Sequence, residues 1–308
     1  MSEKVPVRIG RKTVELSNLD KVFYPEAGFS KGDMIDYYRA VAEAVVPHLK
    51  GRALTLKRYP DGVEGNFFYE KRCPPYAPEW MKTVTMRRKR DSKDIEYCMV
   101  DNEAGLIWAA NLANLELHTS LAKGTDVMRP TSLVFDLDPG PPADILDCAR
   151  VAQWLKPVLE DLGLESFCKT SGSKGMQMFV PLNTKVTYAE TGPFAHALAR
   201  LIEAEHPDQV VTKMKKDLRH GKIFIDWSQN DDHKTTVAVY SLRARPRPTA
   251  STPVTWDEVA RALRSKKPER LSFEARDVVK RIERDGDLFA PVLQTKQKLP
   301  ALDALERA

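Results

Sequence analysis

Two aspartates close an apolar run in the segment Thr131–Pro139, which reads T-S-L-V-F-D-L-D-P. Strand-forming residues precede them, and Pro139 with Gly140 ends the strand. Residues two apart in a strand face the same side, so Asp136 and Asp138 project together, roughly 7 Å apart. Such close like charges cost free energy unless a cation joins them, and Mg²⁺ or Mn²⁺ prefers oxygen ligands. Alone, the motif leaves two solvated acids at a loop entrance as an alternative.

A third carboxylate follows a second apolar strand. Residues 223–225 read I-F-I and end in Asp226, which repeats the arrangement of a buried strand followed by an acid. Three carboxylates complete a two-metal site, in which the ions hold the attacking and leaving oxygens of phosphoryl or nucleotidyl transfer. The sequence therefore predicts a metal centre made by Asp136, Asp138 and Asp226.

A glycine-rich turn at residues 171–175, S-G-S-K-G, lies between these acids and joins two predicted strands. Its glycines let backbone N–H groups approach an anion, and Lys174 with the serine hydroxyls suits phosphate oxygens. Ordinary hairpin turns use the same residues, so the motif is weak by itself. A further strand, Thr235–Leu242, is expected to end at Arg243 and Arg245, which would share a face and grip a triphosphate.

Basic and aromatic residues punctuate the N-terminal part. Ser30 and Asp33 resemble a capping box that starts a helix running to about Leu49. Lys21 and Lys31 flank this helix start, where an anion is favoured, although two surface lysines explain them equally simply.

Adjacent Phe67 and Phe68 must face opposite ways in a strand, so one or both can join the core or form a stacking platform for nucleic acid. His118 is the last residue of the pattern L-E-L-H at 115–118, in which Glu116 and His118 share a face. It lies about a strand's length before the acidic strand. A lone histidine is more often a satisfied polar residue than a catalyst.

Composition limits the class of protein. The 308 residues are 42% hydrophobic, and no apolar run approaches the roughly 20 residues of a membrane helix. The N-terminus, MSEKVPVRIG, lacks the apolar segment of a signal peptide. The net charge of +5 is small, but basic residues bunch at 87–90 and 213–222. Four separated cysteines argue against a zinc site and a disulfide framework, and they fit a reducing compartment.

The order of elements indicates an α/β core. A helix over 143–162 and another over 189–206 alternate with the strands and the hairpin already described. Strands are also expected at 11–17, 53–59 and 95–100, amphipathic helices at 255–263 and 272–283, and a loosely held tail from Lys296.

Taken in order, these motifs resemble the polymerase domain of bacterial DNA ligase D, a branch of the archaeo-eukaryotic primase superfamily. The likeness covers about residues 11–299. The motifs are F-D-L-D-P at 135–139, T-S-G-S-K-G at 170–175, I-F-I-D-W-S-Q-N at 223–230, Y-S-L-R-A-R at 240–245, L-E-L-H at 115–118 and N-L-D-K-V-F-Y-P at 18–25.

The resemblance implies an α/β (α+β) fold. It would hold a primase-like, RRM-like, mixed or antiparallel catalytic sheet flanked by helices, with an N-terminal α/β portion packed on it. It implies one polymerase domain over 1–299, with an N-terminal portion at 11–125, a catalytic core at 126–250, C-terminal helices at 251–299 and a tail at 300–308.

The resemblance also assigns the site residues. Asp136, Asp138 and Asp226 match the metal ligands. The nucleotide would be held by Lys57, His118, Ser171, Ser173, Lys174, Gly175, Gln177, Gln229, Arg243 and Arg245. A downstream 5′-phosphate would be held by Asn18, Lys21 and Lys31, and DNA or its template strand would be contacted by Phe67, Phe68, Lys215, Lys216 and Arg219. Gln177 departs from the histidine that many relatives carry.

The implied activity is DNA-end processing in non-homologous end joining. It would comprise gap filling, primer extension and terminal transfer with two Mn²⁺ or Mg²⁺ ions, with ribonucleotides preferred to deoxyribonucleotides. The expected partners are gapped or broken DNA with a 5′-phosphate, nucleoside triphosphates, the Ku protein and a DNA ligase; a membrane is not expected. The expected location is cytoplasmic and nucleoid-associated. A metal-dependent nuclease or phosphoesterase and a non-catalytic DNA-end-binding module are the alternatives.

Overall fold

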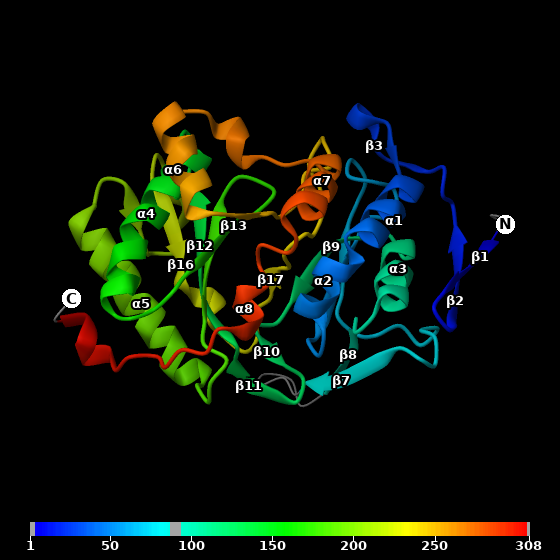
Figure 1. Ribbon diagram of the computed structural model, residues 1–308, viewed down its shortest axis with the longest axis horizontal. Coiled ribbons are helices and arrows are strands. Elements are labelled where there is room, and N and C mark those ends of the chain that lie inside the picture. Colours follow the sequence, from blue (N-terminus) through cyan, green and yellow to red (C-terminus); the bar gives the residue numbers. More distant parts are fainter. Residues whose placement is uncertain (1–3, 87–93, 307–308) are drawn as a thin grey trace. The chain divides into compact units, whose positions relative to one another are not determined.

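The computed structural model describes residues 4–86 and 94–306, which fold into two compact units (Figure 1). Unit 1 comprises Met1–Thr125, Thr235–Ser251 and Phe273–Asp287, and unit 2 comprises Asp126–Lys234, Thr252–Ser272 and Leu288–Ala308. The C-terminal third of the chain thus contributes segments to both units. The single polymerase domain over 1–299 stays a prediction.

A six-stranded sheet forms the centre of unit 2, with the strand order β15-β16-β12-β14-β13-β18. β15 is parallel to β16 and the other neighbours are antiparallel, so the sheet is mixed as predicted. β12 (Ser132–Pro139) is the predicted acidic strand, and its Leu133, Val134, Phe135 and Leu137 are fully buried. The other strands of unit 2 are β11 (Asp126–Pro130), β13 (Phe167–Thr170), β14 (Met176–Pro181), β15 (Val210–Val211), β16 (Ile223–Asp226) and β18 (Pro253–Val254).

Helices α4 and α5 both pack against β12. α4 begins after Asp144, whose carboxylate accepts hydrogen bonds from the amides of Leu146 and Asp147 in a capping box. The two helices predicted at 143–162 and 189–206 are confirmed to within two residues at each end. The helices of unit 2 are α4 (Ile145–Asp161), α5 (Tyr188–Glu205), α6 (Trp256–Ser265) and α8 (Pro291–Gln294), with 3-10 turns η2 (Lys216–Leu218), η3 (Trp227–Gln229), η4 (Pro268–Leu271) and η5 (Leu302–Glu306).

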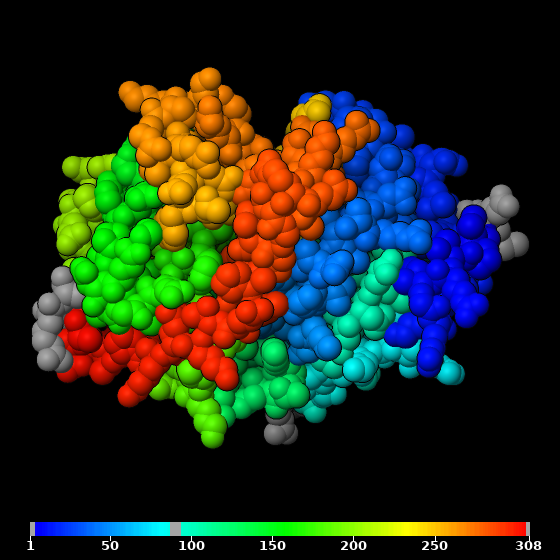
Figure 2. Space-filling view, in the orientation of Figure 1, coloured from blue at the N-terminus to red at the C-terminus, as the bar shows by residue number. Residues whose placement is uncertain are grey.

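The C-terminal segment lies along the surface of unit 2, where Figure 2 shows it in red beside green segments. Gln297 anchors it, because its amide nitrogen donates to the carbonyls of Glu165 and Pro181 and its oxygen accepts from the Glu165 N–H. The prediction of a loosely held tail from Lys296 is therefore wrong for this stretch, since hydrogen bonds from one side chain are not visible in a polar sequence.

Unit 1 has its own six-stranded antiparallel sheet, ordered β17-β9-β5-β8-β7 with β6 paired to β5. Its β9 (Asn114–Thr119) contains the L-E-L-H motif, and Leu115 and Leu117 are fully buried on the core face. The other strands of unit 1 are β1 (Lys4–Ile9), β2 (Lys12–Ser17), β3 (Val22–Tyr24), β4 (Phe29–Ser30), β5 (Leu54–Arg58), β6 (Phe68–Glu70), β7 (Lys82–Met86), β8 (Ile95–Met99), β10 (Ala122–Lys123) and β17 (Thr236–Val237).

The predicted helix from Ser30 to Leu49 is two helices separated at Val41. The capping box at its start is confirmed, since Ser30 and Asp33 bond each other's backbone N–H through their side chains. Val41 adopts φ −95° and ψ 2°, which ends the first helix before the second begins. The helices of unit 1 are α1 (Lys31–Ala40), α2 (Ala42–Leu49), α3 (Glu103–Asn111) and α7 (Ala275–Asp285), with a 3-10 turn η1 (Pro25–Ala27). None of the helices in the described part of the chain is long and apolar enough to cross a membrane.

The strand predicted at Thr235–Leu242 is mostly irregular. Only β17 is a strand, and Tyr240 takes the left-handed φ of 63°, which an extended strand cannot contain. Buried hydrogen bonds hold this turn, because Tyr240 donates its N–H to Ser251 and Tyr37 donates its hydroxyl to the Tyr240 carbonyl. Tertiary contacts override the β-forming sequence here.

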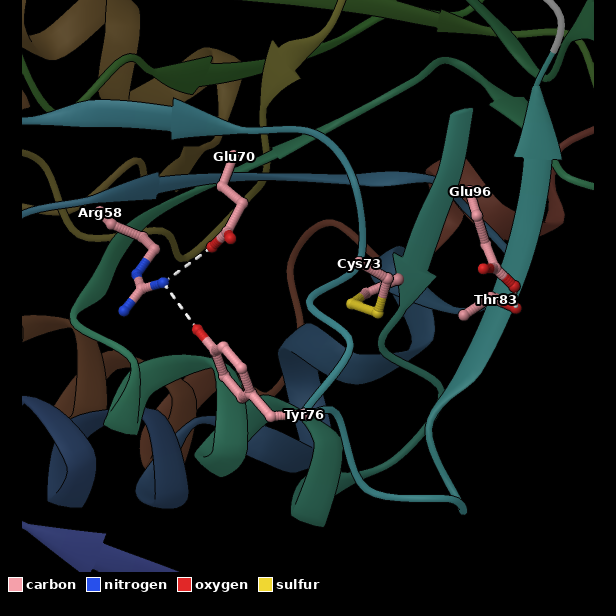
Figure 3. The surroundings of a disulfide bond; sticks show 7 residues. Arg58, Glu70, Cys73, Tyr76, Thr83 and Glu96 are labelled. Carbon is pink, nitrogen blue, oxygen red and sulfur yellow. Dashed lines mark hydrogen bonds and ion pairs between the residues drawn. A yellow bond between two sulfur atoms is a disulfide. The ribbon is translucent and has the colours of Figure 1, made fainter. Parts of the chain in front are cut away.

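A disulfide joins Cys73 to Cys98, contrary to the prediction of no disulfide. The reason is a tertiary contact: the Cys73 N–H donates to the Glu96 carbonyl at 2.7 Å, which places the loop that begins at Cys73 beside β8. The two Cα atoms are then 4.9 Å apart, within the range that a disulfide spans. Figure 3 shows the bond between β8 and the loop that carries Tyr76.

Candidate active site

An acidic row crosses the sheet of unit 2. Asp136 on β12 is the direct cross-strand partner of Asp226 on β16, so their side chains leave the same face of the sheet. Asp138 lies two residues further along β12 and shares that face. The structure thus brings the three predicted carboxylates to one place on unit 2, and strand register is what aligns them.

The same row continues on the other side of Asp136 with two polar residues. Gln177 on β14 is the partner of Asp136, and Lys169 on β13 is the partner of Gln177. Lys169 is fully buried and its ammonium donates to Gln177 Oε1. Because that oxygen accepts from lysine, the amide nitrogen is the group that donates to Asp136.

The electrostatics of the row match a cation site. Burial, and then the nearby charges of Asp138 and Asp226, raise the pKa of Asp136 to about 7, while Gln177 and Lys169 oppose the rise. A carboxylate that is hard to ionise beside two others has a strong affinity for positive charge. The donor set, three carboxylates, also fits a hard divalent ion.

Asp226 is oriented by the short turn that follows it. Its Oδ1 accepts hydrogen bonds from the N–H and hydroxyl of Ser228, and its Oδ2 accepts from Gln229 Nε2 at 2.8 Å. Gln229, which was assigned to the nucleotide, therefore holds a metal-ligand candidate in place. Its contact with a nucleotide stays a prediction.

A compact group of side chains that could bind a metal lies elsewhere in unit 2. Among the residues that the structure describes, Asp231, Asp232 and His233 have ligand atoms that all lie within 4.8 Å, whereas the three predicted carboxylates do not form such a group. Asp231 and His233 are exposed, and such clusters are common without an ion. The register nevertheless places Asp136 and Asp226 directly opposite each other on neighbouring strands.

The phosphate-loop candidate lies against the acidic strand. A Cβ atom at Gly175 would be 2.1 Å from the Leu137 carbonyl oxygen, so only glycine fits there. The amides of Ser173 and Gly175 both donate to Ser171 Oγ, so the serine hydroxyl closes the turn and orients these N–H groups. Ser173 and Lys174 are exposed beside it. The predicted hairpin turn is confirmed, because it joins β13 to β14.

The basic loop at 213–222 is tied to the end of β12. Gly140 donates to the Lys222 carbonyl, and a Cβ at Gly140 would be 1.7 Å from the Arg219 carbonyl oxygen. Lys215 and Lys216 are exposed, but the Arg219 guanidinium lies 3.7 Å from the centre of the Phe224 ring and donates to the Met214 carbonyl. Arg219 thus stabilises the loop itself.

Unit 1 gathers three of the predicted nucleotide-binding residues around Glu116. Lys57 Nζ, His118 Nε2 and Arg243 Nε lie 3.1, 2.8 and 3.5 Å from Glu116 Oε2. Arg243 and Arg245 are in an irregular turn, in which the Arg245 N–H donates to the Arg243 carbonyl, so the shared strand face predicted for them does not exist.

Phe67 and Phe68 lie against different residues of β5, and neither enters the core. They are 51% and 44% exposed. Phe67 lies over Lys57 at 4.7 Å, and Phe68 lies over the Arg58 guanidinium at 5.2 Å. The alternative in which one or both join the core is therefore wrong. Figure 3 shows that Arg58 also reaches Glu70 and Tyr76.

A pocket of about 270 Å³ in unit 1 is lined by Asn18, Lys21 and Lys31, the predicted 5′-phosphate residues. Lys31 is buried, and its ammonium donates to the Ser17 carbonyl and to Asn111 Oδ1. Burial, and then the charges of Lys21 and Arg58, lower the pKa of Lys31 to about 8. Lys21 pairs with Asp61 at 2.6 Å, and Asn18 has a left-handed φ of 55° that shapes the turn. The basic block at 87–90 lies outside the described residues.

Several contacts were missed by sequence reasoning. Arg58 also lines the pocket, and Glu116 and Lys169 contact predicted site residues without having been assigned a role. The alternation of side chains along a strand could have indicated two of these contacts, since Glu116 lies two residues before His118 and Lys169 lies two residues before Ser171. Arg58 gave no such signal, because its contacts come from β6 and from the loop beside the disulfide.

A mixed sheet that carries facing acids on adjacent central strands, beside a hairpin loop of N–H groups, defines the class of primase-superfamily nucleotidyltransferases. The comparisons with known proteins agree. A family model described as "LigD, primase-polymerase domain" matches residues 30–289. The structure of the "Polymerase Domain from Mycobacterium tuberculosis Ligase D in complex with DNA" is similar with a TM-score of 0.84 and 39% identity, over 92% of this chain and 99% of that one.

Curated relatives point the same way. The multifunctional non-homologous end joining protein LigD of Mycolicibacterium smegmatis is 38% identical over 91% of this chain and 36% of its own length. The bifunctional LigD of Bacillus subtilis is 30% identical over 93% of this chain and 45% of its own length. The chain thus spans less than half the length of these relatives. It belongs to the LigD primase-polymerase domain family, whose polymerase chemistry uses a divalent metal and a nucleotide substrate.

Proposed function

We propose that this chain adds nucleotides to the 3′ ends of broken or gapped DNA during non-homologous end joining, with ribonucleotides preferred. The activity would include gap filling, primer extension and terminal transfer. Membership of the LigD polymerase family supports this proposal. The facing pair Asp136 and Asp226 is the observation that carries it, because two-metal nucleotidyl transfer needs neighbouring carboxylates as ligands.

In unit 2, Asp136, Asp138 and Asp226 would hold the metal, proposed to be two Mn²⁺ or Mg²⁺ ions. When bound, such ions lower the pKa of a primer 3′-hydroxyl and neutralise a departing pyrophosphate. Ser228 and Gln229 keep the carboxylate of Asp226 oriented, and Gln177 does so for Asp136.

The hairpin loop of unit 2 is proposed to bind phosphate oxygens. Lys174 supplies a positive charge, Ser171 and Ser173 supply hydroxyls, and Gly175 allows the loop to approach the backbone of the acidic strand. In unit 1, Lys57, His118, Arg243 and Arg245 are proposed to contact the nucleotide, and the cluster around Glu116 supports this for the first three.

DNA is proposed to bind to unit 1 through the pocket at Asn18, Lys21 and Lys31, which suits a downstream 5′-phosphate. Exposed Phe67 and Phe68 are suited to stacking on bases, and the loop with Lys215, Lys216 and Arg219 suits a phosphate backbone. The Ku protein and a DNA ligase are the proposed partners. The proposed location, cytoplasmic and nucleoid-associated, follows from the DNA substrate.

The test is a primer-extension assay on a gapped duplex with a labelled primer and a downstream 5′-phosphate, in Mn²⁺ or Mg²⁺ and with NTPs or dNTPs. We expect template-directed filling of the gap, faster with Mn²⁺ and NTPs, and loss of extension in Asp136→Asn. No extension with any metal and nucleotide would overturn the proposal. Shortening of the label without nucleotide would indicate a nuclease instead.

A further inference from the structure

Glu116 is a buried carboxylate to which neither the family resemblance nor the sequence motifs give a role. Its side chain is 3% exposed and lies on β9, two residues before His118. Five groups converge on it. Lys57, His118 and Arg243 surround Oε2, while the Ala244 N–H and the Tyr59 hydroxyl donate to Oε1 at 3.1 and 3.4 Å.

The carboxylate is ionised in this setting. Burial alone would raise the pKa of Glu116, but the hydrogen bond from His118 and the charges of Arg243 and Lys57 outweigh it and hold the pKa well below its usual range. An ionised carboxylate is an acceptor only, so every neighbour must present a proton to it. Its charge therefore draws two cations, Lys57 and Arg243, into one cluster with its hydrogen-bond donors.

His118 has its tautomer set by this contact. Because Glu116 only accepts, Nε2 must carry the proton that lies between them at 2.8 Å. Burial lowers the pKa of His118, although Glu116 opposes the change, so the ring is mostly neutral near pH 7. A neutral ring with its proton on Nε2 has a lone pair on Nδ1, which accepts hydrogen bonds. Phosphate oxygens are acceptors as well, whereas sugar hydroxyls are donors.

We propose that Glu116 is a positioning residue for nucleotide binding: it holds Lys57, His118 and Arg243 together and leaves Nδ1 of His118 to accept a hydrogen bond from a sugar hydroxyl. This rests on the proposed function, since the nucleotide role of the three neighbours comes from there. The cations Lys57 and Arg243 suit the phosphates, whereas the neutral ring of His118 suits the sugar.

The first experiment measures ATP binding in Mn²⁺ by calorimetry for the wild type and Glu116→Gln. Glutamine keeps the shape and loses the charge, so we expect Kd to rise by about tenfold or more, because hydrogen bonds to charged groups are lost. Glu15→Gln, an exposed carboxylate of unit 1 that pairs with Lys4, is the matched control and should bind ATP as the wild type does. An unchanged Kd in Glu116→Gln would overturn the proposal.

The second experiment reads the tautomer in the wild-type protein and uses a variant only to assign the signals. Nitrogen-15 NMR of labelled histidine in the wild type reports which ring nitrogen carries the proton, with the His118 signals assigned by their loss in His118→Phe. We expect the Nε2–H tautomer near pH 7. A proton on Nδ1 would overturn the proposal.

The third experiment compares ATP, 2′-dATP and 3′-dATP in the wild type and in His118→Phe, which keeps a ring but has no acceptor. We expect the wild type to bind one deoxy analogue more weakly than ATP, and His118→Phe to bind that analogue and ATP alike. Loss at the 2′ or the 3′ position identifies the hydroxyl, and unchanged discrimination would overturn the sugar contact. As a control, each variant should bind 5′-phosphorylated DNA as tightly as the wild type does, which shows that its unit 1 is folded. A wild-type protein that does not extend primers would overturn the proposed function only. The role of Glu116 is tested separately, because the three experiments above measure binding and NMR signals.

Discussion

Asp136 and Asp226 are direct cross-strand partners on β12 and β16, and no loop separates either of them from a buried strand. The spacing of the two carboxylates is therefore set by the register of a central sheet. Gln177 and Lys169 extend the same row across β14 and β13. A site built in this way keeps its geometry at the cost of electrostatic repulsion, and that cost can be measured.

Asp136→Asn should abolish primer extension and at the same time stabilise the metal-free protein. The pKa of Asp136 is raised to about 7 by burial and by Asp138, so the folded state favours its protonated form. The stability contributed by that proton is present at low pH and is lost as pH rises through about 7. We therefore expect the variant to melt a few degrees higher than the wild type at pH 8, and by a smaller margin at pH 5.5.

Thermal unfolding with a chelator at the two pH values checks this. Asp208→Asn, an exposed carboxylate of unit 2, is the control and should change neither the melting temperature nor extension. A variant that melts below the wild type at pH 8 would contradict the repulsion described for the acidic row.

Lys169→Met should weaken the apparent affinity for Mn²⁺ without touching a metal ligand. The Lys169 ammonium fixes the oxygen of Gln177, which turns the amide nitrogen toward Asp136. Without the lysine, the amide is free to flip and to present its oxygen to the carboxylate. Loss of such a supporting contact costs about 10- to 100-fold in metal affinity or activity.

The measurement is the Mn²⁺ concentration that gives half-maximal extension, compared with Lys185→Met, an exposed lysine of the same unit. Gln177→His supplies a second comparison, because a histidine can donate to Asp136 without needing an oriented amide. It should retain extension when Lys169 is absent. If Lys169→Met needs no more Mn²⁺ than the wild type, the orienting role of the lysine is excluded.

The acidic row illustrates what local sequence can predict. The apolar runs that end in Asp136, Asp138 and Asp226 are strands because β-branched and aromatic residues are followed by turn formers. The capping box at Ser30 and Asp33 is equally local. Whether two such strands are neighbours, and in which register, is a tertiary fact that no local pattern contains.

The failures have the same physical origin. The disulfide of Cys73 depends on a backbone bond to Glu96, the end of the strand after Thr235 depends on a turn at Tyr240, and the C-terminal segment is anchored by Gln297. Each depends on a partner far away in the sequence. Spacing and composition carry no information on such pairs, so only the structure reveals them.

Lys31 predicts a pH dependence of DNA-end recognition. Its pKa is lowered to about 8 by burial and by the charges of Lys21 and Arg58, so the free pocket loses positive charge as pH rises from 7 to 9. A terminal phosphate has its second pKa near 6 and keeps its charge over this range. The preference for a 5′-phosphate over a 5′-hydroxyl should therefore fall severalfold between these pH values.

Fluorescence anisotropy with metal-free buffer and the two DNA ends measures the preference. Lys31→Arg should flatten the pH profile, since guanidinium stays charged, and Lys31→Met should lower the preference at every pH. The folded state holds fewer protons on Lys31 than the unfolded chain does between about pH 8 and 10.5, so this residue should add stability as pH rises through that window. A preference that is constant from pH 7 to 9 in the wild type would contradict the assignment.

The Cys73–Cys98 disulfide should matter for the stability of unit 1 far more than for DNA binding. It closes a sequence separation of 25 residues, for which loop-closure entropy gives about 3 kcal/mol. Reduction should lower the urea midpoint of unit 1 accordingly.

The loop that the disulfide tethers carries Tyr76, which bonds Arg58 at the pocket, but Arg58 keeps its ion pair with Glu70 on β6 at 2.8 Å. The affinity for 5′-phosphorylated DNA should therefore change by less than about tenfold, because the ion pair with Glu70 still holds the guanidinium when the hydrogen bond to Tyr76 is lost. The double variant Cys73→Ser, Cys98→Ser should match the reduced wild type and should not respond to reductant. A wild-type midpoint that is insensitive to reductant would show that the bond does not contribute, and a large loss of DNA affinity would show that Glu70 alone does not hold Arg58.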